Sequence, residues 1–320
     1  IFQKLNGMFA IAIWDENKQK LLLARDRAGE KPLHYFNNSN TFLFGSEIKS
    51  LLLHPEISKE INWNAFDEFF SFGYISAPDS IYKNIKKLKQ AHYLILQNGV
   101  VTEKPYWKID LNNKNIYTYQ EAQEHCFKLL EDSVKIRLMS DVPLGAFLSG
   151  GIDSSIIVAL MAKNSSKPVK TFSIGFDYSD FDETKYAKII ADKYTTEHTE
   201  LIVTPNYSAL IESILSNFDE PFGDSSALPT YLVSKLTREY VKVALSGDGG
   251  DELFGGYNSY QEMIKLKSKI NLVPSSLKKI ASHYYKYFDS STKHGKKLRL
   301  LGMNDIERFL WSSTHFTEDE

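Results

Sequence analysis

Short apolar runs alternate with polar turns over the first third of the chain, a pattern typical of antiparallel β structure. The Asn-rich stretch at 37–40 and the Asn98-Gly99 pair are turn signals between such runs. Helical spacing of apolar residues is confined here to residues 64–72. Strands are expected at residues 8–14, 19–24, 33–36, 41–44, 93–96 and 100–101. Residues 1–106 are therefore predicted to form antiparallel sheets with little helix.

The chain becomes polar and rich in Asn and Lys between Lys108 and Thr118, which indicates a domain boundary. Thr118 and Glu121 have the spacing of a capping box, so a helix is expected to begin there. The apolar positions that follow recur at helical spacing and are expected to face a core: Ala122, Cys126, Leu129, Leu130 and Val134.

Strands and helices alternate after this helix. Strands are expected at residues 144–148, 169–174, 200–203 and 241–245. Further helices are expected near residues 152–161, 186–194, 209–217 and 230–239. Strand, loop and helix in this order predict a doubly wound parallel sheet. The tail after Met263 is basic and is predicted to be helical.

Two of the predicted strands end in loops of Ser, Gly and Asp that lead into helices, Ser149–Ser155 and Ser246–Asp251. The carboxyl ends of parallel strands meet at one edge of a sheet, where ligands bind. Small residues leave backbone amides accessible, and with hydroxyl groups beside them they suit phosphate oxygens at the start of a helix. The first loop lacks the Gly-Lys-Ser/Thr ending of a Walker A loop.

Both loops also carry carboxylates, whose negative charge a phosphate site must neutralise. Asp153 would repel a bare phosphate, so it predicts a bridging cation, for which we expect Mg²⁺. Asp248 and Asp251 could hold the same ion from the other loop. The alternative is that Gly-rich turns with Asp only cap helices. Two such loops at strand ends favour a ligand site over that alternative.

Composition narrows the class of protein. At 320 residues the chain suggests about two domains. Its 38 basic and 40 acidic residues give 38 − 40 = −2, which argues against a general binder of nucleic acid or membrane surfaces. The single cysteine, Cys126, excludes an intrachain disulfide and a thiolate metal cluster. No apolar run is long enough to span a bilayer, and we expect a cytoplasmic protein.

Ser149–Ser155 resembles the signature loop of ATP pyrophosphatases, which cleave ATP between the α and β phosphates. Four further stretches resemble one particular family of these enzymes: residues 141–145 (DVPLG), 171–176 (TFSIGF), 219–226 (DEPFGDSS) and 245–257 (LSGDGGDELFGGY). Earlier stretches resemble a glutaminase half: residues 7–10, 25–33 and 45–49. Together they resemble the glutamine-hydrolysing asparagine synthetases of the bacterial B type, over essentially the whole chain.

The resemblance implies an α/β fold in two parts. A partial, antiparallel-sheet Ntn-type glutaminase domain is expected at 1–108, followed by a parallel-sheet ATP-pyrophosphatase domain (adenine nucleotide alpha hydrolase-like) at 116–320. It also implies a carbon–nitrogen ligase. In the family, ammonia from glutamine reaches a site where the aspartate side chain attacks the α-phosphate of ATP, and ammonia then displaces AMP from β-aspartyl-AMP. The expected cofactors are ATP and Mg²⁺. The expected partners are aspartate, glutamine or ammonia, and ATP, with no nucleic acid and no membrane. A homodimer is one option for an oligomeric state that the sequence leaves open.

The resemblance also implies roles for particular residues. Those expected to cradle the pyrophosphate are Ser149, Gly150, Gly151, Ser154 and Ser155, and those expected at the adenosine are Phe147, Ile174, Ser246 and Gly247. Asp153, also an ATP-binding residue, and Asp251 are the expected Mg²⁺ ligands. Asp248 stands where several relatives have a glutamate implicated in forming the acyl-adenylate. It either orients an attacking group in the transition state or caps the helix after Gly250.

The sequence departs from the family pattern in the first domain as well. Ile1 is not the N-terminal cysteine nucleophile, and Gln90-Ala91-His92 replaces the usual Pro-Gly-His. The distal basic residues near the pyrophosphate would lie beyond Glu320, so we expect the middle piece of a longer protein. A relative that amidates or cyclises another carboxylate is the main alternative. Asp153 and Asp251 speak against a catalytically dead paralogue, and a single cysteine with no net positive charge speaks against a tRNA-thiolating enzyme.

Overall fold

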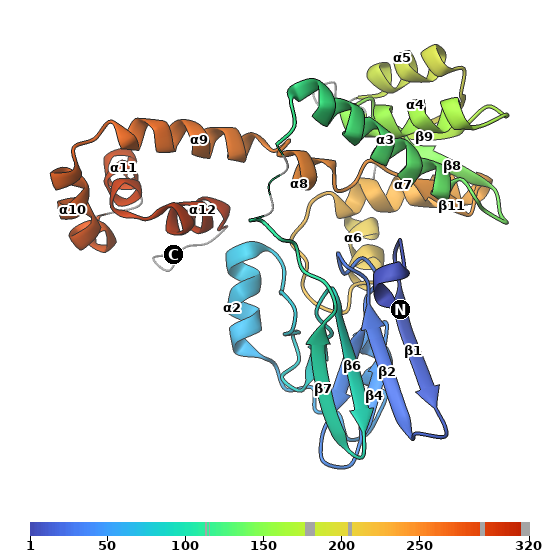
Figure 1. Ribbon diagram of the computed structural model, residues 1–320, viewed down its shortest axis with the longest axis horizontal. Helices are drawn as coiled ribbons and strands as arrows, with labels where there is room; N and C mark the ends of the chain where they lie inside the picture. The colour runs from blue at the N-terminus through green and yellow to red at the C-terminus, as the bar shows by residue number, and fades with distance from the viewer. Residues whose placement is uncertain (113, 115, 177–182, 204–206, 289–291, 315–320) are drawn as a thin grey trace. The chain divides into compact units, whose positions relative to one another are not determined.

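The chain folds into two compact units (Figure 1), which we call unit 1 and unit 2. The computed structural model describes residues 1–112, 114, 116–176, 183–203, 207–288 and 292–314. Unit 1 comprises Ile1–Lys114, Ser216–Asp224 and Lys279–Glu320. Unit 2 comprises Asn115–Leu215 and Ser225–Lys278.

Unit 1 is built on two antiparallel sheets, as the alternating apolar runs predict. One sheet has the strand order β1-β2-β6-β7 and the other has the order β4-β3-β5. The strands are β1 (Ala10–Asp15), β2 (Lys20–Arg25), β3 (His34–Asn37), β4 (Phe42–Gly45), β5 (Ile85–Lys87), β6 (His92–Gln97) and β7 (Val100–Pro105). Asn98 and Gly99 close the β6–β7 hairpin with φ of 53° and 74°. That left-handed pair is the conformation that a tight hairpin turn favours.

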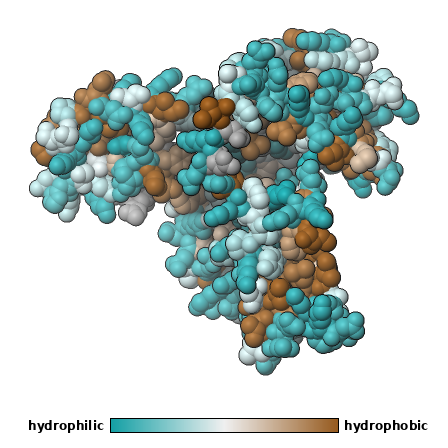
Figure 2. All heavy atoms as spheres, viewed as in Figure 1, coloured by the Kyte–Doolittle hydropathy of each residue, from teal (hydrophilic) through white to brown (hydrophobic). Residues whose placement is uncertain are grey.

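Two small cores stabilise these sheets. The first contains Leu21, Leu23, Leu33, Tyr35, Leu88 and Leu94, and the second contains Phe36, Ile48, Leu51, Ile57 and Ile85. The helices of this part are the 3₁₀ turn η1 (Phe2–Lys4), α1 (Ile48–Leu51) and α2 (Trp63–Phe72). Figure 2 shows apolar side chains on the surface over β1 and β2, where Ile13 and Trp14 are about half exposed. Most residues of the edge strand β1 are thus exposed.

Arg25 and Asp26 tie the strands of unit 1 to the loop that follows them. The Asp26 carboxylate is almost completely buried and accepts the backbone N–H groups of Glu30 and Lys31, each at 2.9 Å. Arg25 donates to the carbonyl oxygen of Lys31 and to that of Leu88, both at 2.8 Å. These contacts support a structural role for both residues.

Unit 2 contains a parallel sheet of strand order β10-β9-β8-β11. Its strands are β8 (Leu144–Phe147), β9 (Lys170–Phe176), β10 (Glu197–Val203) and β11 (Val243–Leu245). From β8 the chain adds β9 and β10 on one side and then places β11 on the other side. The direction of winding therefore reverses between β8 and β11, which is where doubly wound folds bind their ligands.

Helices lie on both faces of this sheet (Figure 1). The helices packed on the sheet or on one another are α3 (Tyr119–Arg137), α4 (Ile152–Asn164), α5 (Thr184–Tyr194), α6 (Tyr207–Leu215) and α7 (Ala227–Tyr240). Helices α8 (Gly250–Phe254) and α9 (Asn258–Asn271) follow β11. One face packs on α3, α4 and α5 through a core that includes Val134, Leu148 and Val158. On the other face the ring of Tyr240 at the end of α7 lies 5.6 Å from that of Phe172 on β9. This is the doubly wound arrangement that the sequence predicts.

Helix α3 begins where the sequence predicts, but only its C-terminal half packs against the core. The Glu121 N–H donates to Thr118 Oγ1 at 3.3 Å, and the Thr118 N–H donates to Glu121 Oε2 at 2.8 Å, which completes the capping box. Leu129, expected in the core, is 71% exposed, whereas Val134 is 3% exposed. Ala122 is exposed and Cys126 only half-buried, so the expectation for the first half of the helix was wrong. Spacing defines the apolar face of a helix, but the length of the element packed against it decides how much of that face is covered.

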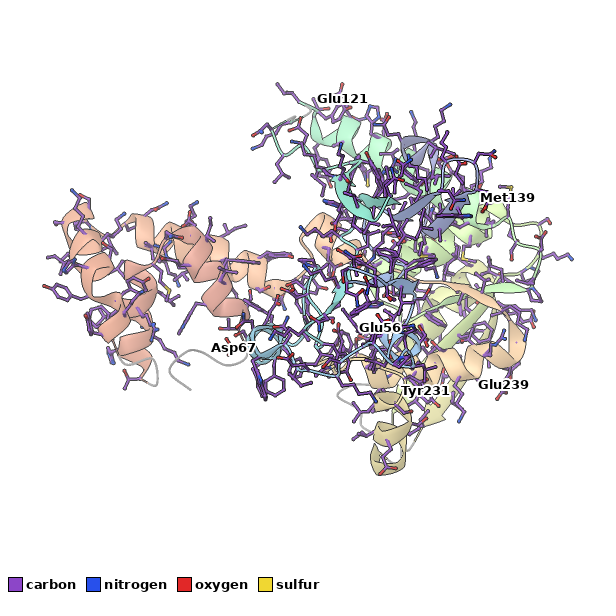
Figure 3. All side chains as sticks on the ribbon, turned by 90° about the horizontal axis from the view of Figure 1, so that it is seen from below. Glu56, Asp67, Glu121, Met139, Tyr231 and Glu239 are labelled. Atoms are coloured by element: carbon purple, nitrogen blue, oxygen red, sulfur yellow. The ribbon has the colours of Figure 1, made fainter. Side chains whose placement is uncertain are left out.

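The C-terminal part of the chain is helical, as expected. It contains α10 (Ser275–Tyr284), the 3₁₀ turn η3 (Tyr285–Tyr287), α11 (Lys293–Gly302) and α12 (Asp305–Ser313). Figure 3 shows the side chains of the described residues and labels Glu121, in the first turn of α3, and Met139, just after the end of that helix. Among the described residues we find no helix with the length and apolar character that crossing a lipid bilayer requires.

Candidate functional site

The two Ser-Gly loops lie side by side at the carboxyl edge of the parallel sheet. Leu245, the last residue of β11, pairs with Ala146 on β8. Beyond β8 the Leu148 N–H donates to the Phe172 carbonyl oxygen at 2.8 Å, which holds the start of the first loop against β9. Both loops then lead directly into helices, α4 and α8. They therefore flank the point where the winding of the sheet reverses.

Glycines let the two loops touch. A Cβ added to Gly247 would lie 2.7 Å from the Ser154 backbone nitrogen, and one added to Gly250 would lie 2.5 Å from the carboxyl carbon of Asp153. Distances this short leave no room for a side chain at Gly247, whose neighbour is backbone, and a side chain at Gly250 would have to displace the Asp153 carboxylate. The Asp153 carboxylate therefore rests on the second loop, next to the residue that precedes Asp251. The structure brings the two loops together as the sequence predicts.

Position 150 requires a glycine because of its backbone conformation and its contact with α5, neither of which the sequence revealed. Its φ of +85° lies in the left-handed region that favours glycine. A Cβ there would also lie 2.5 Å from the Ala187 nitrogen and 2.5 Å from Tyr186 Cβ, both near the start of α5. Tyr186 and Ala187 thus support the loop from another helix. Tyr186 is the first residue of the helix that the sequence predicts at 186–194, and its side chain is 51% exposed.

The hydroxyl groups of the first loop differ in what they can bind. Ser149 Oγ and Ser154 Oγ lie 3.0 Å apart, and Ser154 Oγ also donates to the Gly151 carbonyl oxygen at 3.2 Å. Ser154 therefore holds the loop in shape. Ser155 Oγ, one turn into α4, is buried and has no hydrogen-bond partner among the described atoms. A buried hydroxyl at the start of a 13-residue helix, whose N-terminal amides attract anions, fits a phosphate oxygen.

The second loop presents its carboxylates in different directions. Asp248 is exposed, and its Oδ2 accepts the Ser246 hydroxyl at 2.8 Å. The N-cap of α8 is Gly249, with φ of +89°, and no described side chain makes a cap hydrogen bond there. The capping interpretation of Asp248 is therefore wrong. The Asp251 carboxylate packs against Gly256, where a Cβ would overlap it.

The pair Asp153 and Asp251 is the donor set expected for a magnesium ion at this edge. Mg²⁺ in nucleotide sites commonly takes one or two carboxylates together with substrate phosphates and waters. The two loops offer two carboxylates and, at the start of α4, donors for phosphate, so the residues fit such an ion in kind. No three His, Cys, Asp or Glu side chains gather as a metal site in the described part of the chain, at this edge or away from it, so the protein ligands offered here are these two carboxylates.

The residues expected at the adenosine lie on the same edge. Phe147 pairs with Phe172 in the β8–β9 register, so both side chains lie on one face of the sheet. Ile174, two residues after Phe172 on β9, lies on that face as well. Ser246 and Gly247 follow β11 directly. The sequence-predicted site residues are thus gathered in unit 2: Phe147, Ser149, Gly150, Gly151, Asp153, Ser154, Ser155, Ile174, Ser246, Gly247, Asp248 and Asp251.

The fold and the family matches together define a class of protein, in which an antiparallel-sheet amidotransferase domain is followed by a parallel-sheet domain of the ATP-pyrophosphatase type. Residues 1–107 match the family described as glutamine amidotransferase domain. Residues 126–314 match the family described as asparagine synthase. The chain belongs to the asparagine synthase family.

Several curated relatives are similar over most of this chain. An asparagine synthetase (glutamine-hydrolyzing) 1 from Bacillus subtilis is 37% identical over 98% of this chain and 50% of its own length. A Methanocaldococcus jannaschii protein, provisionally named asparagine synthetase (glutamine-hydrolyzing) 2, is 44% identical over 81% of this chain and 51% of its own length. The amidase chry2 of Gibberella zeae is 29% identical over 80% of this chain and 41% of its own length. This chain spans about half the length of the first two relatives.

Proposed function

We propose that the protein containing this chain makes asparagine from aspartate and glutamine-derived ammonia at the expense of ATP. The proposed reaction passes through β-aspartyl-AMP and releases AMP and pyrophosphate. The observation that carries the proposal is the contact of the two loops, with the Asp153 carboxylate resting on Gly250 beside Asp251. Membership of the asparagine synthase family supports the same reaction.

Each part of the loops has a task in this reaction. The amides at the start of α4, with the unpartnered Ser155 hydroxyl, would bind the oxygens of the departing pyrophosphate. Donors fixed in advance stabilise the charge that develops in a transition state. Gly150, Gly151 and Ser149 would let the phosphates approach the backbone, while Ser154 keeps the loop in shape. Phe147, Ile174, Ser246 and Gly247 would contact the adenosine.

Asp153 and Asp251 would hold Mg²⁺ against the triphosphate. When bound, this ion neutralises phosphate charge, so that an aspartate carboxylate can approach the α-phosphorus. Asp248, exposed and fixed by the Ser246 hydroxyl, would act on the acyl-adenylate or on the incoming ammonia. Its shorter side chain reaches about one methylene less than a glutamate.

The proposal extends to the organisation of the whole protein. We assign residues 1–108 to a partial Ntn-type glutaminase domain and residues 116–320 to the synthetase domain. The glutaminase would supply ammonia, and the synthetase domain would bind aspartate and ATP. A cytoplasmic location and a homodimeric assembly remain predictions.

The test uses the full-length enzyme with aspartate, ATP and ammonia. Asp153→Asn should abolish aspartate-dependent pyrophosphate release and leave glutamine hydrolysis largely intact. Asp132→Asn, at an exposed position on α3, is the matched control and should behave as wild type. Pyrophosphate release at near wild-type rates in the Asp153 variant would show that the metal assignment is wrong.

A second candidate is an amidotransferase that acts on another carboxylate. This second candidate is supported by the similarity to a protein named an amidase, at 29% identity over 80% of this chain. The two candidates differ in the acceptor alone. AMP formation measured with a panel of carboxylic acids, each with ammonia and ATP, separates them. If the protein makes asparagine, aspartate should give the fastest AMP formation among the acids of the panel.

A further inference from the structure

Residues 216–224, which we call the strap, pack in unit 1 although the helices on either side belong to unit 2. Helix α6 ends at Leu215 and α7 begins at Ala227. The strap lies in the part of the chain that matches the asparagine synthase family. The residues that it contacts, described next, lie in the part that matches the amidotransferase domain. A segment of one family domain is therefore held by the other.

A buried ion pair holds the centre of the strap. Glu220 Oε1 pairs with Lys87 Nζ, and the two side chains are only 19% and 12% exposed. The other carboxylate oxygen accepts the Ile81 N–H at 3.2 Å, and Lys87 also donates to the Ile75 carbonyl oxygen at 2.6 Å. Burial raises the pKa of Glu220, and the hydrogen bond and charge of Lys87 oppose that rise. Both charged groups are thus fixed by additional hydrogen bonds.

Two further contacts fix the strap on either side of Glu220. Asp219 Oδ2 accepts the N–H of Ile48, the first residue of α1, at 2.5 Å. The Gly223 N–H donates to the Gly73 carbonyl oxygen at 2.7 Å. A Cβ on Gly223 would lie 3.1 Å from Gly73 Cα, which leaves little room for any side chain. The strap is therefore held at three points along its length.

Buried ion pairs are a costly way to stabilise a fold, because desolvation offsets the attraction between the charges. Their best-attested use is to select one arrangement of packed elements over others. The strap continues through α7 and β11 into the loop that carries Asp248 and Asp251. We propose that Asp219 and Glu220 are positioning residues that fasten this segment to the residues of unit 1 that match the amidotransferase domain, so that released ammonia is used for synthesis instead of escaping to solvent. This inference rests on the proposed function.

The test compares two neutralised glutamates in the full-length enzyme. Glu220→Gln removes the buried charge with little change in shape. Glu60→Gln is the matched control, since Glu60 pairs with Lys83 at 2.7 Å while the two side chains are 55% and 60% exposed. The readout is glutamine consumed per asparagine formed. We expect the ratio to rise roughly fivefold or more in Glu220→Gln, the lower end of typical coupling between sites. In Glu60→Gln it should stay at the wild-type value.

Ammonia-dependent synthesis separates positioning from a general structural role. It should keep the wild-type rate in Glu220→Gln, because the contact between Asp153 and Gly250 lies within unit 2. Lys87→Met and Asp219→Asn should raise the glutamine ratio in the same way. An equal ratio in Glu220→Gln and Glu60→Gln, or a parallel loss of ammonia-dependent synthesis, would overturn the proposal.

Hydrogen exchange gives a readout that does not depend on asparagine synthesis. Amides of residues 219–223 should exchange clearly faster in Glu220→Gln than in Glu60→Gln, and equal exchange would contradict the fastening role. If the wild-type protein makes no asparagine even from ammonia, the proposed function fails and the coupling role fails with it. Exchange then still decides whether Asp219 and Glu220 fasten the strap.

Discussion

The contact between Gly250 and Asp153 can be tested with a single methyl group. In Gly250→Ala the new Cβ would lie 2.5 Å from the Asp153 carboxyl carbon and 2.6 and 2.9 Å from its two oxygens. Ordinary van der Waals contact begins at 3.4 Å, so the carboxyl group must move by 3.4 − 2.5 = 0.9 Å. A misplacement of about 1 Å in a catalytic arrangement can cost on the order of 10²-fold in rate.

The same substitution should not harm the fold. Gly250 is the first residue of α8, and alanine in a helix is favoured over glycine by about 0.5–1 kcal/mol. The displaced atoms belong to a side chain, which can rotate away at small cost. We therefore expect an unchanged or slightly raised melting temperature together with a roughly hundredfold loss of activity.

The assay is aspartate-dependent pyrophosphate release by the full-length enzyme with saturating ATP and ammonia, alongside a thermal melt. Leu253→Ala, in the same short helix at a side chain that is 80% exposed, serves as the control and should keep wild-type activity. The double variant Gly250→Ala with Asp153→Asn should be no worse than Asp153→Asn alone, because both changes remove the same contact. Near-normal turnover in a stable Gly250→Ala variant would refute the assigned role of this contact.

Two further predictions concern Asp248 and His34. Asp248→Ala should leave the melting temperature within a few degrees, because Gly249 is the N-cap of α8, and should lower ammonia-dependent asparagine formation about 10²–10³-fold. Asp248→Glu should retain much of the activity, and normal turnover of the alanine variant would remove Asp248 from the site. Burial lowers the pKa of His34 to about 4 from 6.5, so the stability that its neutral form contributes above pH 6.5 is lost progressively as the pH falls from 6.5 to 4. Urea unfolding should show a loss of about 2 kcal/mol from this group between pH 7 and pH 5; His34→Gln should lack that loss, and an equal loss in both proteins would contradict the assignment.

Features that depend on neighbours in the chain were determined by the sequence itself. The capping box of Thr118 and Glu121 and the turn at Asn98 and Gly99 each involve residues within three positions of one another. Local hydrogen bonding and backbone preference suffice to specify them. The alternation of strands and helices after residue 140 likewise predicts the parallel sheet. Its topology then brings the two Ser-Gly loops to one edge.

Other features were decided only by tertiary packing. Nothing local distinguishes the buried Val134 from the exposed Leu129, because the difference depends on which part of α3 the core reaches. Nor does the spacing of Asp248 before α8 show that Gly249 occupies the capping position.

Long-range pairs are the clearest case. Glu220 pairs with Lys87 and Gly150 packs against Ala187, although these partners are 133 and 37 positions apart. A glycine or a glutamate carries no sign of its distant partner in its own neighbourhood. Its role appears only when the folded chain brings the partner into contact, because packing and desolvation act between residues that are close in space, whatever their distance along the chain.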